Sequence, residues 1–299
     1  MGPGVDMRAL AILLALLAAV ALAYGAQFQN DAVAQKSKTK NLLKGSLSLK
    51  QLLNLVTHPR WLSGTVFMGI AIVLQLGALS LAPLIVVQPI GAVALVITSL
   101  LNARATKTRL NKGTIIAVTL CTLGIAAFVS MASGVADETE LSDDRLREVL
   151  TVLGVILAIF GTLFFTIGKR MKALIYVTGA GVLYGFVATL AKVVIQRIYQ
   201  GQFEWLTVLC AVGLIVAVSL GGWFVQNAYS SGPPDLVIAG LTVIDPLVAV
   251  SIGIIILGEA QQASLPTMIG FGLSALVAVI GVYLISKVHP ELRHKKPVA

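Results

Sequence analysis

Apolar runs of about 20 residues recur along almost the whole chain, and short segments that hold the charges separate them. A helix of that length matches the hydrocarbon thickness of a bilayer. Only 12% of the 299 residues are charged, against roughly 25% in a soluble domain, which excludes an ordinary water-soluble enzyme. The runs also lack the alternation of transmembrane β-barrel strands. The sequence therefore predicts an all-α, polytopic membrane protein.

Apolar runs bounded by charged residues, Pro or Gly predict nine transmembrane helices. The first run also resembles a signal peptide, with Ala21-Leu22-Ala23 as the cleavage site. Cleavage would send the basic segment that follows across the membrane, which positive charge resists, so we expect the first helix to be retained. The predicted spans are Ala9–Phe28, Trp61–Ala82, Leu84–Ala103, Gly113–Ser133, Val149–Ile167, Ala173–Ile195, Trp205–Asn227, Leu236–Leu257 and Leu265–Ser286.

Basic residues are divided unevenly between the two sides of these spans. With the N-terminus outside, the inner segments hold 17 of the 22 Lys and Arg residues, including those of the tail 287–299. This bias predicts an N-out/C-in chain in the plasma (inner or cytoplasmic) membrane. The net charge of +9 is thus assigned to membrane topology, and the lipid bilayer, not nucleic acid, is the expected partner.

Two connecting segments carry patterns of their own. Within the inner loop 29–60, Ser46–Thr57 has an apolar stripe at helical spacing, which predicts a short helix on the membrane surface, with a gate or partner helix as the alternative. The outer segment Ala136–Glu148 carries six acidic residues. It is interpreted as a solvated loop, and attraction of cations is the functional alternative.

The order of features in the first half returns in the second half. Gln75 and Gln226 each stand eight residues before a proline at the end of a span, and the next span holds an internal proline, Pro89 or Pro246, which predicts a helix break. Because the odd fifth span inverts the second unit, we predict a 4+1+4 inverted repeat, which is typical of secondary transporters. The predicted units are a first repeat 1–133, a linking loop and helix 134–172, a second repeat 173–286 and a basic tail 287–299.

These prolines and glycines also have a purely structural interpretation. Membrane helices use Pro and Gly to shape their packing. Gly181-x-x-x-Gly185 is most simply such a close-packing face. Cys121 and Cys210 lie inside apolar runs and are predicted to be small buried hydrophobic residues.

Two segments resemble those of known transporter families. Residues Gly77–Ala92, Gly-Ala-Leu-Ser-Leu-Ala-Pro-Leu-Ile-Val-Val-Gln-Pro-Ile-Gly-Ala, resemble the short-loop-plus-proline segment of NIPA-type magnesium transporters. Residues Pro234–Ala249, followed by Leu257-Gly258-Glu259, resemble the second EamA repeat. Both families belong to the drug/metabolite transporter superfamily. The resemblance implies a secondary carrier or permease of small molecules, or of Mg²⁺ in the NIPA branch.

The first half departs from the EamA pattern. Asn102-Ala103-Arg104 stands where a second Leu-Gly-Glu would fall. Small multidrug carriers of the superfamily use a glutamate in their first helix, whereas the first span here has Gln27 and no carboxylate. Proton-coupled drug exchange by that route is therefore not expected.

Ionisable residues inside membrane spans are functional candidates. Asp245 lies near the middle of its span beside Pro246, and Lys192 lies in the outer half of its span. Asp245 could bind a cation or carry a proton, or it could form a buried pair with Lys192 that only fixes the packing. A second group of polar candidates for the substrate pathway could equally form interhelical hydrogen bonds, and comprises Gln75, Gln88, Gln226, Asn227 and Tyr229. Asp235 and Glu259, at span ends, are predicted to be solvated caps.

The sequence also bears on other classes of function. No nucleotide-binding loop of the form G-x-x-x-x-G-K-[ST] occurs, and no cofactor is predicted. A membrane enzyme would need a cluster of acid, base or nucleophile residues, which the sequence lacks, so the chain is predicted not to be an enzyme. A transporter of a small molecule or ion is the primary prediction, with a NIPA-type Mg²⁺ permease and a non-transporting assembly protein as alternatives. A positive Lys192 near the site would oppose Mg²⁺, so the charge of the cargo stays open.

Overall fold

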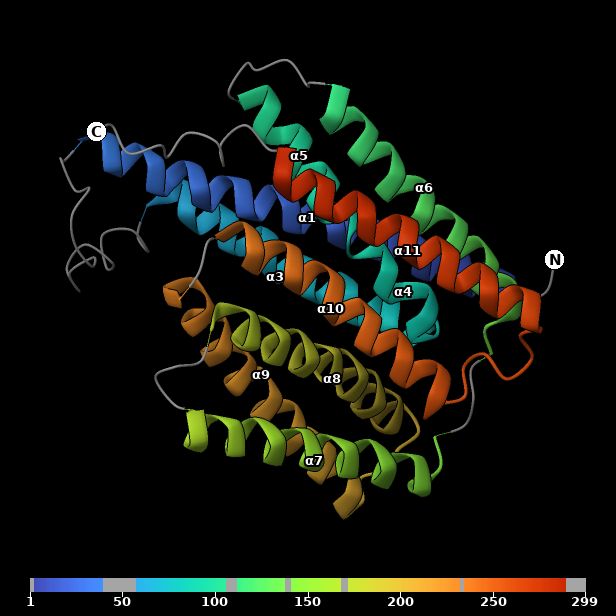
Figure 1. The fold of residues 1–299 in the computed structure, drawn as a ribbon. Helices are drawn as coiled ribbons and strands as arrows, with labels where there is room; N and C mark the ends of the chain where they lie inside the picture. Colours follow the sequence, from blue (N-terminus) through green and yellow to red (C-terminus); the bar gives the residue numbers. More distant parts are fainter. Residues whose placement is uncertain are drawn as a thin grey trace.

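The computed structural model describes residues 3–39, 58–105, 112–137, 141–167, 172–231 and 234–288. Helices form all of the regular secondary structure of these residues, and they run roughly along one common direction as a bundle (Figure 1). The helices are α1 (Pro3–Thr39), α3 (Pro59–Leu81), α4 (Leu84–Ile90), α5 (Val93–Ala105), α6 (Lys112–Val135), α7 (Asp143–Ile167), α8 (Ala173–Tyr199), α9 (Trp205–Ser231), α10 (Pro234–Ile255) and α11 (Leu265–Val288).

The number of predicted spans is confirmed for the described part of the chain. Nine stretches there are long and apolar enough to cross a membrane, and each coincides with a predicted span. Seven of these spans each correspond to all or most of one helix. The first span lies within α1, which is much longer than the span, and the span Leu84–Leu101 comprises α4 and most of α5. The protein is a multi-pass membrane protein.

The two internal prolines have different effects. A turn at Gly91 and Ala92 separates α4 from α5, so the predicted break after Pro89 is present. By contrast α10 stays helical from Pro234 to Ile255, so the break predicted at Pro246 is not observed. Both prolines remove one backbone donor, but only Pro89 is followed within two residues by a glycine, which weakens the helix further.

Two helices extend beyond their predicted ends. The predicted inner loop 29–60 is wrong for its first residues, because α1 continues to Thr39 through good helix formers such as Ala, Gln and Lys. The helix α7 begins at Asp143 instead of Val149, since Ser142 Oγ accepts from Arg145 N (3.4 Å) and acidic residues favour a helix N-terminus. The predicted surface helix Ser46–Thr57 lies outside the described residues.

The helices are divided by their order in the chain into two groups, α1 to α6 and α8 to α11, which contact each other extensively. In one group α1 packs along α3, and in the other α8 packs along both α9 and α10. The groups meet where α6 packs on α11 and where α4 packs on α10. The helix α7 lies at the edge of the bundle against α9 and α8, and most of its surface is not covered by other helices, as a lipid-facing helix requires.

Glycines permit the closest of these approaches. A Cβ on Gly181 would lie 2.7 Å from Ile244 of α10, and one on Gly185 would lie 2.6 Å from Val248. The close-packing face predicted from Gly181-x-x-x-Gly185 is thereby confirmed, and its partner is α10. On α11, a Cβ on Gly281 would overlap the backbone nitrogen of Cys121 on α6.

Replacing Gly281 with alanine is expected to lower the thermal unfolding temperature of the purified protein in detergent. The added methyl group meets backbone, which cannot rotate away, and overpacking of this kind costs about 1–3 kcal/mol. Gly272→Ala is the matched control, because it lies on the same helix with open space around its Cβ position. An equal effect of both substitutions would show that the α6–α11 contact is not tight.

Candidate functional site

A cavity of about 790 Å³ lies between the two groups of helices. Its wall is formed by α1, α3, α4 and α5 from one group and by α8, α10 and α11 from the other. Most of the lining residues are small or apolar. The polar ones are Gln75, Gln88, Thr98, Ser99, Tyr184, Thr242 and Asp245.

Asp245 is the only Asp, Glu, Lys or Arg residue among the described residues that line this cavity. Its Oδ1 atom is buried and has no hydrogen-bond partner among the described residues, and the same holds for Ser99 Oγ. Buried polar atoms in folded proteins normally have a partner, so an orphaned carboxylate oxygen beside a cavity indicates a ligand position. The sequence prediction that singled out Asp245 therefore coincides with the charged point of the cavity wall.

The local sequence explains why Asp245 lies at this place. Gly181 on α8 brings α10 close, since its Cβ position is 3.4 Å from the backbone nitrogen of Asp245. Pro246 has no N–H group, so the carbonyl of Thr242 lacks its usual helical donor. The hydroxyl of Thr242 donates to the carbonyl of Ile238 (2.8 Å), and Thr98 likewise donates to Ala94 (2.8 Å).

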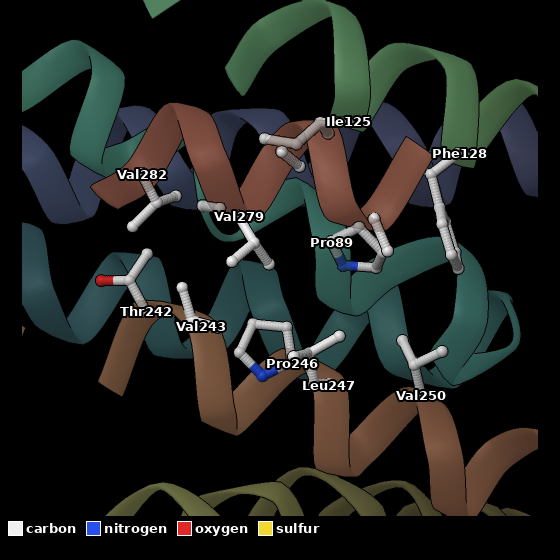
Figure 2. Close-up of a pocket in the computed structure, with 13 residues that line it drawn as sticks. Pro89, Ile125, Phe128, Thr242, Val243, Pro246, Leu247, Val250, Val279 and Val282 are labelled. Carbon is white, nitrogen blue, oxygen red and sulfur yellow. The ribbon is translucent and has the colours of Figure 1, made fainter. Parts of the chain in front are cut away.

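A smaller apolar pocket of about 60 Å³ separates the two internal prolines. Figure 2 shows Pro89 of α4 and Pro246 of α10 on opposite sides of it, with Phe128 of α6 at one end. Thr242 and Pro246 line both this pocket and the larger cavity. Free space beside two helices that each lack one backbone hydrogen bond leaves room for them to bend.

Lys192 does not line the cavity, and it does not pair with Asp245. Its ammonium group lies 3.2 Å from Glu259 Oε1 and donates to the carbonyl oxygen of Ala82 (2.9 Å), and both charged side chains are almost fully buried. The structural pair proposed between Lys192 and Asp245 is therefore absent. The positive charge that weighed against a cationic cargo is neutralised by Glu259.

The prediction that Glu259 is a solvated cap was wrong about its surroundings. Its carboxylate accepts hydrogen bonds from the backbone N–H groups of Leu84 (2.9 Å) and Ile85 (3.0 Å), and so caps the N-terminus of α4 from inside the protein. The turn that allows this includes Gly258, with φ of 70°, and the Glu259 N–H returns to the carbonyl of Gly253 (2.9 Å).

The Lys192–Glu259 pair lies at the opposite end of the bundle from most of the cavity. The pair joins the end of α3, the start of α4 and the α10–α11 connection. The cavity instead reaches Ser99 late in α5, Ile238 early in α10 and Ile285 late in α11. In the predicted N-out topology the pair is at the outer end and the cavity extends toward the inner end.

Further contacts join the helices at the same end as this pair. Arg8 of α1 donates to the carbonyl of Ser133 in α6 (2.8 Å), and Arg197 of α8 pairs with Asp143 of α7. The backbone N–H of Asp137 donates to the carbonyl of Glu259 (3.0 Å). These contacts tie four helices and two connections together at that end.

The remaining predicted polar residues lie on α9, which contributes no described residue to the cavity lining. Gln226 and Tyr229 are exposed, and Asn227 donates to the carbonyl of Trp223 within its own helix (2.8 Å). Asp235 is the second residue of α10, and its side chain lies outside the described part of the structure. The structure therefore brings Gln75, Gln88 and Asp245 together in one cavity and leaves the α9 candidates outside it.

Direct metal ligation by a dense cluster finds no support in the described residues. Among them, no group of three or more His, Cys, Asp or Glu residues is arranged so that it could hold a metal ion. Cys121 and Cys210 are free and buried, which confirms their predicted place in the apolar interior.

No protein-family model and no solved structure matches the chain. An uncharacterized protein of Corynebacterium glutamicum is 29% identical over 279 residues, which cover 93% of this chain and 95% of the relative. A protein of Arabidopsis thaliana named a probable magnesium transporter, NIPA9, is 26% identical over 277 residues, 88% of this chain and 79% of the relative. The chain is thus a multi-pass membrane protein similar over most of its length to a probable NIPA magnesium transporter.

Proposed function

We propose that the protein is a secondary transporter of the drug/metabolite transporter superfamily that carries a small cation by alternating access. The observation that carries the proposal is the cavity between the helix groups with the unpartnered carboxylate oxygen of Asp245 in its wall. Ionisable residues inside membrane domains that face a cavity mark substrate and ion pathways. A non-transporting assembly protein needs no such cavity.

The sign of the cargo's charge is inferred from the surroundings of Lys192 and Asp245. Lys192 is neutralised by Glu259 and lies outside the cavity lining, whereas Asp245 has no counter-ion among the described lining residues. A cavity whose wall carries a single negative charge attracts cations and repels anions. An anionic substrate, which Lys192 would have favoured, is therefore the weaker alternative.

The contacts between helices support an inverted 4+1+4 repeat. The first two spans of each unit pack together, α1 on α3 and α8 on α9, and the proline-containing α4 and α10 contact each other. The last spans of the two units, α6 and α11, also pack on each other, while α7 stays at the edge. This reciprocal pairing is expected of two units related by a pseudo-twofold axis in the membrane plane.

Alternating access fits the unequal ends of the bundle. The end that holds Lys192 and Glu259 is closed by buried polar contacts, and the cavity extends toward the other end. We assign this arrangement to an inward-facing state in the plasma membrane, with the N-terminus outside. Opening of the outer end would require the Lys192–Glu259 contacts to α4 to separate.

Magnesium is the small cation that we propose as the cargo. The Arabidopsis relative is named a probable magnesium transporter, and the similarity covers 88% of this chain. Mg²⁺ usually keeps several of its waters in protein sites, so a wall with only one carboxylate is compatible with it. Organic cations are the alternative within the same proposal.

The proposal is tested by flux into vesicles that contain the purified protein. With a Mg²⁺-sensitive dye trapped inside, external Mg²⁺ is expected to raise the signal faster than in protein-free vesicles, and the same vesicles serve for Ca²⁺, organic amines and amino acids. If the folded, monodisperse protein transports none of these solutes, the proposed transport function is contradicted.

A further inference from the structure

We infer that the cavity recognises a divalent cation together with its inner shell of water, so that Asp245 contacts the bound water molecules and not the metal. This inference rests on the proposed function and specifies the form in which the cargo is bound. It is drawn from the size of the cavity and from the hydrogen-bonding character of its wall.

The size of the cavity argues against a dehydrated ion. Bare Mg²⁺ requires six oxygens at about 2.0–2.1 Å in near-octahedral geometry. The cavity measures about 790 Å³, and its polar side chains come from five separate helices, α3, α4, α5, α8 and α10. Six oxygens spread over such a wall cannot converge on one small ion unless the helices collapse around it.

A hydrated ion fits the same space without rearrangement. Six water molecules at liquid density occupy on the order of 180 Å³. The cavity therefore has room for the ion, its six waters and further solvent. Because Mg²⁺ gives up its waters reluctantly, retaining them also avoids a large energetic cost.

Several polar groups in the wall present acceptors to such a shell. The hydroxyls of Thr98 and Thr242 already donate their hydrogens to backbone carbonyls, so their lone pairs are what remains for a ligand. The Thr242 carbonyl has lost its helical donor to Pro246, and Asp245 contributes carboxylate oxygens. Metal-bound water turns its hydrogens outward, so these acceptors and the single negative charge of Asp245 complement a hydrated cation.

The test uses cobalt(III) hexaammine, whose six ammonia ligands do not exchange and whose N–H groups point outward in an octahedron. We expect this complex to bind the purified protein and to inhibit Mg²⁺ flux competitively. Asp245→Asn is expected to weaken its binding by at least about tenfold, which corresponds to 1.4 kcal/mol. Thr242→Val, which removes one acceptor and keeps the shape, is expected to weaken it by a smaller factor.

Two matched variants control for indirect effects. Asp144→Asn removes an exposed carboxylate, and Thr162→Val removes a hydroxyl of α7 that donates within its helix (2.7 Å) but lies outside the cavity. Neither is expected to change binding of the cobalt complex.

Three outcomes of the flux and binding measurements would overturn the inference. If the protein transports Mg²⁺ but cobalt hexaammine does not inhibit this flux or compete with Mg²⁺ for binding, the inference is overturned and the transport function stays intact. The ion would then be bound directly. If Asp245→Asn and Asp144→Asn weaken binding of the cobalt complex equally, the inference is also overturned. Absence of any cation flux would overturn both.

Discussion

Replacing Asp245 with asparagine is expected to reduce cation flux to the level of protein-free vesicles. The amide keeps the shape of the carboxyl group but removes the only charge among the described residues of the cavity wall. A hydrogen bond to a charged group contributes about 1.5–3 kcal/mol, so its loss weakens cation binding by roughly 10- to 100-fold. Initial rates of Mg²⁺ entry into vesicles measure the effect.

The controls for this prediction address folding and general electrostatics. Asp245→Asn is expected to insert in the membrane and to elute as a monodisperse species, because the Oδ1 atom has no partner among the described residues to lose. Asp144→Asn, at an exposed position on α7, is expected to transport as the original protein does. Unchanged flux in Asp245→Asn would remove this residue from the pathway.

Replacing Glu259 with glutamine is expected to destabilise the protein more than replacing Lys192 with methionine. Glu259→Gln can still offer one amide oxygen as an acceptor, but it removes the carboxylate that pairs with the buried ammonium of Lys192, and breaking one side of a buried pair costs about 3–5 kcal/mol. In Lys192→Met the carboxylate still accepts from the N–H groups of Leu84 and Ile85. Thermal unfolding of the purified variants measures the difference.

The double variant Lys192→Met with Glu259→Gln provides the control. It removes both charges, so its loss of stability is expected to be smaller than the sum of the two single losses. Strict additivity would mean that the two side chains do not interact in the protein as it exists in the membrane or detergent.

The sequence predicted the number and approximate place of the spans because bilayer thickness imposes a length on every apolar run. It also predicted a helix break at both internal prolines, and only the break at Pro89 is present, because α10 continues through Pro246. A proline alone removes one hydrogen bond, and the outcome depends on its neighbours: Gly91 follows Pro89, whereas Leu247 and Val248 follow Pro246 and sustain the helix. The extension of α1 was missed because polarity was taken as the end of the helix, although helix formers continue into water.

Asp245, Gln75 and Gln88 could be selected from the sequence because polar groups in the middle of a span are rare and functionally informative. The pairing of Lys192 with Glu259 could not, because the two residues are 67 positions apart and meet only through the turn at Gly258. The Leu257-Gly258-Glu259 sequence was the available signal, since a glycine before a carboxylate at a helix end permits the side chain to turn inward.

The similar order of features in the two halves was the reason for selecting residues on α9. Gln226 was matched with Gln75 because both stand eight residues before a proline. In the structure α3 lines the cavity, whereas α9 contributes no described lining residue to it and packs against α8 and α7. Related order along the chain therefore did not give equivalent positions around the cavity.

This cavity is proposed to be the aqueous pathway of the cargo, and labelling of a Thr98→Cys variant tests that role. Thr98 lines the cavity, and the native Cys121 and Cys210 are buried, so they give a low background. In oriented vesicles, a charged, membrane-impermeant thiol reagent is expected to react with the new cysteine from the inner side, and Mg²⁺ is expected to slow that reaction. Labelling that is absent from the inner side, or that proceeds at the same rate with and without Mg²⁺ or any other cation, would show that the cavity is not the pathway.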